Sequence, residues 1–108
     1  MSVLASPRRC EILRLAWKEE RSAGDIHRAL PDVSFAAVSQ QLRLLTERGL
    51  MRVRPEGRQR YYQADRDALA AVAPMLEEMW DTALWRLKLA AELEQARRGP
   101  RARRRSRR

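Results

Sequence analysis

The segment 34–63 constrains the fold most, because its hydrophobic period changes halfway along. Its first half has apolar residues at the helical spacing of three and four positions, namely Val38, Leu42 and Leu45. Ser34 suits the cap of this helix and Gly49 suits its stop. Residues 50–63, LMRVRPEGRQRYYQ, then flank a turn containing Pro55, Glu56 and Gly57, as the strands of a hairpin do. The segment therefore predicts a helix that leads directly into a two-stranded hairpin with an arginine-rich tip.

Two shorter helices are predicted before this segment. Residues 7–20, PRRCEILRLAWKEE, have apolar side chains at helical spacing, and Ser6 suits their cap. Residues 23–30, AGDIHRAL, follow a second candidate cap, Ser22, and Asp25 stands three positions later, as a capping box requires. A brief turn joins this helix to the next, which is the helix-turn-helix pattern. We therefore predict a winged helix-turn-helix fold, mainly α with a small β-hairpin.

The last third of the chain returns to helical spacing from Asp65. Pro74 lacks the amide donor that a helix interior needs, so we expect a longer helix to start near it and to span about 74–96. This helix has two adjacent apolar sets, so one face can cover its own domain while another meets a partner. We expect it to dimerise the protein, with Trp80 foremost in an interface made of Trp17, Leu76, Met79, Trp80, Ala83, Leu84 and Leu87.

The positive charge of the chain is unevenly distributed. The formal net charge is +9, but residues 97–108 hold 8 of the 23 basic residues and no acid. We therefore expect one folded domain over 1–96 and a disordered arginine-rich tail over 97–108. Within the body, residues 43–66 carry seven arginines against three acids. This stretch is the candidate DNA-binding face.

Several classes of protein are excluded by what the sequence lacks. One cysteine allows no internal disulfide, and no apolar stretch or secretory signal pattern points to a membrane or to export. We therefore expect a cytoplasmic, nucleoid-associated protein without a membrane partner. The four glycines stand singly, and no nucleophile and base are paired. We predict that the protein is not an enzyme and has no cofactor.

Two stretches resemble the ArsR-type bacterial winged-helix repressors. ASPRRCEIL, residues 5–13, looks like the family's A-D-P-T-R-R-x-I-L opening. SFAAVSQQLRLLTERGLMRVRPEGRQRYYQ, residues 34–63, looks like its S-x-x-x-V-S-x-H-L recognition helix followed by its G-L-V wing. The resemblance covers residues 4–90. It implies a symmetric homodimer that binds operator DNA and represses transcription until an effector, which the sequence does not name, releases it.

The resemblance also indicates which residues would contact double-stranded DNA. The start and the exposed face of a recognition helix meet base edges, so we expect contacts from Ser34, Ala36, Ser39, Gln40, Gln41 and Arg43. Gln40 is the first choice, because glutamine can pair with adenine through two hydrogen bonds. At the hairpin we expect phosphate or minor-groove contacts from Arg54, Arg58 and Arg60, with Arg52 as a further candidate. Two recognition helices would then enter successive major grooves, about 34 Å apart, on a pseudo-palindromic operator.

Two departures from the family pattern keep the operator sequence open. Phe35 stands where the family often has a polar residue, and Gln41 where it usually has histidine. Phe35 is expected to pack beneath the start of the helix, with contact to a thymine methyl group as the alternative. Tyr61 and Tyr62 are interpreted as the core of the wing, and the three tryptophans as core or interface residues.

A metal site is not expected, because the sensors of the family place ligands where this chain has none. Residues 23–30 contain no cysteine and residues 69–96 contain no histidine. His27 is interpreted as an exposed helical residue. Cys10 is interpreted as buried and inert, with a reactive thiol beside Arg9 as the alternative.

Two other functions stay open at this stage. The apolar last helix could dock a protein partner while the tail holds the complex to nucleic acid or to an acidic membrane surface. The arginine-rich tail could instead bind structured RNA.

Overall fold

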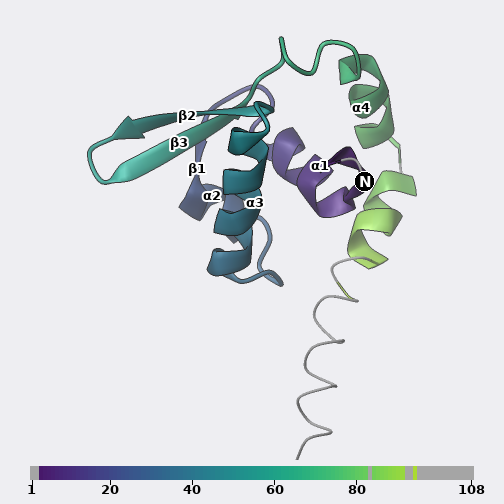
Figure 1. Cartoon of the computed structure of the whole chain (residues 1–108). Helices are drawn as coiled ribbons and strands as arrows, with labels where there is room; N and C mark the ends of the chain where they lie inside the picture. The colour runs from purple at the N-terminus through teal and green to yellow at the C-terminus, as the bar shows by residue number, and fades with distance from the viewer. Residues whose placement is uncertain (1–2, 83, 92–93, 95–108) are drawn as a thin grey trace, which may run out of the picture.

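A computed structural model of the 108-residue chain describes residues 3–82, 84–91 and 94. In chain order its elements are the 3-10 helix η1 (Val3–Ala5), α1 (Pro7–Leu15), β1 (Arg21–Ser22), α2 (Ala23–Arg28), α3 (Phe35–Glu47), β2 (Met51–Glu56), β3 (Gln59–Ala64) and α4 (Ala73–Trp80). Residues 84–91 form a further helical segment. Figure 1 shows the β2–β3 hairpin projecting from one side of the helices α1 to α3, whereas α4 and the segment 84–91 lie on the other side. We call the hairpin, residues 51–64, the wing.

Local capping interactions fix both helices of the helix-turn-helix, α2 and α3. The Ser22 hydroxyl accepts a hydrogen bond from the Asp25 amide at 3.0 Å, and the Asp25 carboxylate accepts one from the Ser22 amide at 3.4 Å. This is the predicted capping box. The Ser34 hydroxyl accepts from the Ala37 amide at 3.1 Å and caps α3 in the predicted way.

The end of α3 depends on Gly49, as predicted. Gly49 has a φ of 77°, which costs a residue without a side chain little. Its amide donates to the Thr46 carbonyl at 3.0 Å, and the Leu50 amide donates to the Leu45 carbonyl at 2.9 Å. These two bonds are the Schellman arrangement, which satisfies the last carbonyls of a helix and turns the chain away from its axis. The turn sends the chain directly into the wing.

The sheet has three antiparallel strands in the order β1-β3-β2. Met51 pairs with Ala64 at the base of the wing and Glu56 pairs with Gln59 near its tip. The turn therefore lies at Gly57 and Arg58, later than the Pro55–Gly57 turn expected from the sequence. Pro55 is tolerated within β2 because β2 is an edge strand, where a missing amide donor need not break the ladder.

The first helix is shorter than the expected 7–20, and β1 was not expected. α1 ends at Leu15, and the Ala16 carbonyl accepts a hydrogen bond from the Ala64 amide at 2.9 Å. Arg21 and Ser22 then pair with the middle of β3. Ala16, Arg21 and Ser22 thus form backbone hydrogen bonds with β3 instead of within a helix, so α1 stops at Leu15.

The expected long helix from Pro74 is interrupted after Trp80. Asp81 is the C-cap of α4, and the Thr82 hydroxyl accepts a hydrogen bond from the Trp85 amide at 3.1 Å. Thr82 thus caps the segment 84–91. An N-cap marks the start of a new helix, so the helix is not continuous through Thr82. The turn allows Trp85 to reach the core, where it is buried. Residues 92–93 and 95–108, which include the predicted tail, lie outside the described residues.

The core joins the helices and the strands β2 and β3 into one cluster. Its largest fully buried side chains are Ile12, Leu13, Ile26, Leu30, Val38, Leu42, Leu45, Leu69 and Leu76. Trp17 and Trp85 are buried with them, and Trp80 packs against the cluster from its edge. The indoles of Trp17 and Trp80 meet edge to face, with centroids 5.0 Å apart. In the described part of the chain, no helix is long and apolar enough to cross a membrane.

Candidate nucleic-acid interface

The outer face of α3 presents most of the residues predicted to read DNA. Val38, Leu42 and Leu45 are turned into the core. The side chains of Ser34, Ala36, Gln40 and Arg43 are exposed, and Ser39 is half-buried. Residues 36, 40 and 43 are separated by four and three positions, so they share one side of the helix. Gln40 therefore stands where a glutamine could reach a base edge.

Gln41 is engaged within the protein. Its amide oxygen accepts a hydrogen bond from the Arg9 guanidinium at 2.7 Å, across 32 residues of sequence. This contact ties α3 to α1 and uses one of the two lone pairs of the Gln41 amide oxygen. The DNA contact predicted for Gln41 stays a prediction.

A groove of about 350 Å³ separates α3 from the wing. Its walls are Ser39, Arg43, Thr46 and Glu47 from α3 and Val53, Arg60 and Tyr62 from the wing. Three of the predicted DNA-binding residues, Ser39, Arg43 and Arg60, are therefore brought together in space. Tyr62 also packs against the core cluster, in agreement with its interpretation as wing core.

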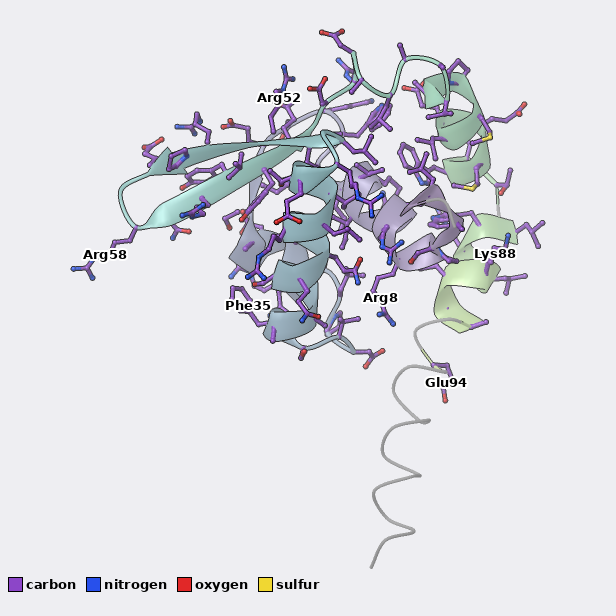
Figure 2. The ribbon with its side chains drawn as sticks, viewed as in Figure 1. Arg8, Phe35, Arg52, Arg58, Lys88 and Glu94 are labelled. Carbon is purple, nitrogen blue, oxygen red and sulfur yellow. The ribbon has the colours of Figure 1, made fainter. Side chains whose placement is uncertain are left out.

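The arginines of the wing divide between its two faces. Side chains alternate across a strand, and directly paired residues share a face. Val53 pairs with Tyr62 and Pro55 pairs with Arg60, so these residues share the face toward α3. Arg54 pairs with Tyr61 on the opposite face. Figure 2 shows Arg52 on the side of the wing away from α3 and Arg58 projecting from the tip.

Arg54 is held by two carboxylates. Its guanidinium donates three hydrogen bonds to Glu20, at 2.8, 2.9 and 3.2 Å, and one to Glu56 at 2.5 Å. It also lies over the ring of Tyr61, 5.0 Å from the centroid. The hydrogen bonds with Glu20 and Glu56 raise the pKa of Arg54, and those from Arg54 lower the pKa of Glu20. Among the residues that the structure describes, no carboxylate pairs in this way with Arg58 or Arg60.

Glu20 is the residue that the sequence reasoning missed. It lies 34 positions before Arg54, in the connection between α1 and β1. The pairing of β1 with β3 brings this connection beside the wing. A two-residue strand leaves no periodic signal, so the sequence offered nothing that would place Glu20 there.

Phe35 contradicts the expectation that it packs beneath the start of α3. Its side chain is 50% exposed. One side of the ring meets the ring of His27 edge to face, with centroids 5.6 Å apart and planes at 82°. Figure 2 shows it at the N-terminal end of α3, on the side toward which the wing projects.

The residues predicted for a dimer interface differ in how far the core of a single chain already buries them. Trp17 and Leu76 are 4% and 1% exposed, so the core of a single chain already uses them and leaves little surface for a partner. Met79 and Trp80 are partly buried against that core. Leu84 and Leu87 are 71% and 69% exposed. Ala83 lies outside the described residues.

A buried carboxylate attaches the segment 84–91 to α1. Glu11, 5% exposed, accepts a hydrogen bond from the Trp85 indole at 3.2 Å and two from Arg14 at 2.8 and 2.5 Å. The adjacent Cys10 is also buried, and its thiol donates to the Leu4 carbonyl at 3.4 Å. Burial raises the pKa of Cys10 and favours its protonated form. Across the described ranges, no three His, Cys, Asp or Glu residues are grouped so that they could hold a metal ion.

An exposed recognition helix beside a basic wing defines a winged helix-turn-helix transcriptional regulator. A family model described as a helix-turn-helix domain matches residues 4–54. An ArsR-like transcriptional regulator from Rhodococcus sp. RHA1 is 32% identical, with a TM-score of 0.60 over 87% of this chain and 84% of that one. This chain belongs to the ArsR family of transcriptional regulators.

Two other proteins are similar over shorter parts. An HTH-type transcriptional regulator from Mycobacterium tuberculosis is 43% identical over 63 residues, which is 58% of each chain. The chain thus spans less than two thirds of that relative. The structure of the homodimeric winged helix-turn-helix DNA-binding domain of a possible ArsR-family regulator from Mycobacterium bovis is 29% identical. Its TM-score is 0.62, over 76% of this chain and 75% of that one.

Proposed function

We propose that this regulator is a homodimeric repressor that binds a pseudo-palindromic operator in double-stranded DNA. The observation that carries the proposal is the common groove of α3 and the wing, where Ser39, Arg43 and Arg60 meet. Gln40 is exposed beside it on α3, and Arg58 projects from the wing tip. Polar groups on the helix can read bases while guanidinium groups on both elements neutralise phosphates.

Two protomers place two such surfaces on one duplex. The homodimeric Mycobacterium bovis domain supports a dimer. In this chain the segment 84–91, which lies on the side of the molecule opposite the wing (Figure 1), has two exposed apolar side chains, Leu84 and Leu87. A dimer formed there keeps both recognition helices free for successive major grooves. Occupation of the operator blocks transcription. This regulation takes place in the cytoplasm, at the nucleoid, and it involves no catalysis.

Binding of the full chain to DNA tests the proposal. A duplex selected from random sequences and a scrambled duplex of the same composition are titrated by fluorescence anisotropy at two salt concentrations. We expect at least tenfold tighter binding to the selected duplex at both, because base contacts add to the salt-dependent phosphate contacts. Transcription of a reporter carrying the selected site upstream should fall when the protein is added.

Equal binding to both duplexes would contradict the proposal. The exposed leucines of segment 84–91 would then favour the alternative, a protein-interaction module that holds its partner at nucleic acid. Tight binding without any change in reporter transcription would contradict repression alone.

A further inference from the structure

The exposed large apolar side chains of the described residues lie in two places. Met75, Leu84 and Leu87 belong to α4 and the segment 84–91, the side proposed to meet the second protomer. Phe35 is the fourth, and it is the first residue of α3. Figure 2 shows it at the other side of the molecule, away from α4 and Lys88. A dimer formed by the C-terminal leucines therefore leaves Phe35 uncovered.

The surroundings of Phe35 fix the ring and leave part of it accessible. His27 of α2 supports it edge to face. Its neighbours along the chain, Ser34 and Ala36, are small and exposed, and Ser39, four positions on and next to it on the helix surface, is also small, so none of them covers the ring. The Ser34 hydroxyl is engaged with the Ala37 amide, which holds the helix start in place. The ring of a half-exposed residue thus stands at the N-terminal end of α3, the end that would enter a major groove.

We propose that Phe35 is a specificity-determining residue that contacts the 5-methyl group of a thymine in each half-site. The inference rests on the proposed function. A phenyl ring gains nothing from the polar base edges or the phosphates, whereas the thymine methyl is the one apolar group that a base pair displays in the major groove. Contact between ring and methyl removes apolar surface of both from water. Phe35 therefore favours thymine over cytosine at one base pair of each half-site.

Replacement of single thymines in the selected duplex by deoxyuridine tests this contact, because it removes one methyl group and leaves base pairing unchanged. For the wild-type chain we expect roughly fourfold weaker binding at one position per half-site, the value for one buried methyl or methylene group. The Phe35→Ala variant should bind thymine and uracil equally at that position. The exposed residue Gln40 supplies the control, because Gln40→Ala should keep the fourfold difference there.

Phe35→Gln provides a second test, since a polar side chain suits an exposed position and should also abolish the difference. Thermal unfolding followed by circular dichroism shows which variants are folded. Phe35 variants that still distinguish thymine from uracil would overturn the inference. So would a wild-type chain that prefers the selected duplex but tolerates every methyl removal, and the proposed function would then stand. A wild-type chain without preference for the selected duplex overturns both.

Discussion

Arg54 and Arg60 show how two arginines of one hairpin differ in what they can bind. Arg54 lies on the face away from α3, and its guanidinium already faces Glu20 and Glu56. Arg60 lies in the groove beside Arg43. The carboxylates beside a guanidinium balance its positive charge, so the group attracts a phosphate less strongly. We therefore interpret Arg54 as a residue that braces the wing and Arg60 as a DNA contact.

The salt dependence of DNA binding separates these two roles. Each phosphate contact contributes about 0.9 to the slope of log K against log salt concentration. Arg60→Ala should lower the magnitude of the slope by about this amount, and Arg54→Ala should leave it nearly unchanged. Anisotropy titrations over a series of salt concentrations measure both slopes. If Arg54→Ala lowered the slope as much as Arg60→Ala does, the ion pair between Arg54 and Glu20 would have to open when DNA binds.

Gln40 and Gln41 form a matched pair of neighbouring glutamines. Gln40 is exposed, whereas the Gln41 oxygen accepts from Arg9. Gln40→Ala should reduce discrimination at one base pair by about 1–3 kcal/mol and leave stability nearly unchanged. Gln41→Ala should lower the free energy of unfolding by about 1 kcal/mol through the lost hydrogen bond. Urea unfolding and titrations with single base-pair changes measure the two effects, and the reverse assignment would contradict this prediction.

The elements that could be predicted from sequence are those fixed by local interactions. The capping box of α2, the Ser34 cap and the Gly49 stop each depend on residues within a few positions of one another. The elements that were missed depend on distant partners. The end of α1 and the strand β1 are set by β3, more than 35 positions later.

The same distinction applies to the candidate site. Helical periodicity correctly placed Ser34, Ala36, Gln40 and Arg43 on the surface of α3. It could not show that Gln41 is bound by Arg9 or that Arg54 is bound by Glu20, since both contacts need the folded chain. Nor could it distinguish the buried Leu76 from the exposed Leu87, because both lie in one apolar stripe whose helix is broken between them.

Thr82 decides where that stripe is broken. Its hydroxyl caps the segment 84–91 through the Trp85 amide. Thr82→Ala should lower the free energy of unfolding by about 1 kcal/mol, as loss of an N-cap does. Thr82→Ser retains a hydroxyl and should restore most of it. Chemical unfolding compares the three proteins, and equal stability of Thr82→Ala and wild type would mean that the cap contributes nothing.

At the scale of the whole molecule, the two exposed leucines of the segment 84–91 carry the proposed assembly. Leu84→Glu together with Leu87→Glu should convert the dimer into a folded monomer, because charged side chains are costly in an apolar interface. Sedimentation equilibrium measures the mass, and anisotropy should show much weaker binding to a full operator. Phe35→Gln is the control, since it removes an exposed apolar side chain from the opposite side and should stay dimeric. A double variant that stays dimeric would place the interface elsewhere.

The helix α1 and the two residues that follow it, Ala16 and Trp17, connect the two halves of the molecule. Glu11 and Trp17 hold the C-terminal helices through Trp85 and Trp80, and the Ala16 carbonyl holds the base of the wing at Ala64. The surface proposed to join two protomers and the surface proposed to meet DNA are therefore attached to the same short segment, residues 7–17. In a dimer, this attachment fixes the distance between the two DNA-binding surfaces. We expect such a dimer to accept half-sites one helical turn apart, about 10 base pairs, and to reject the same half-sites when half a turn of DNA is inserted between them.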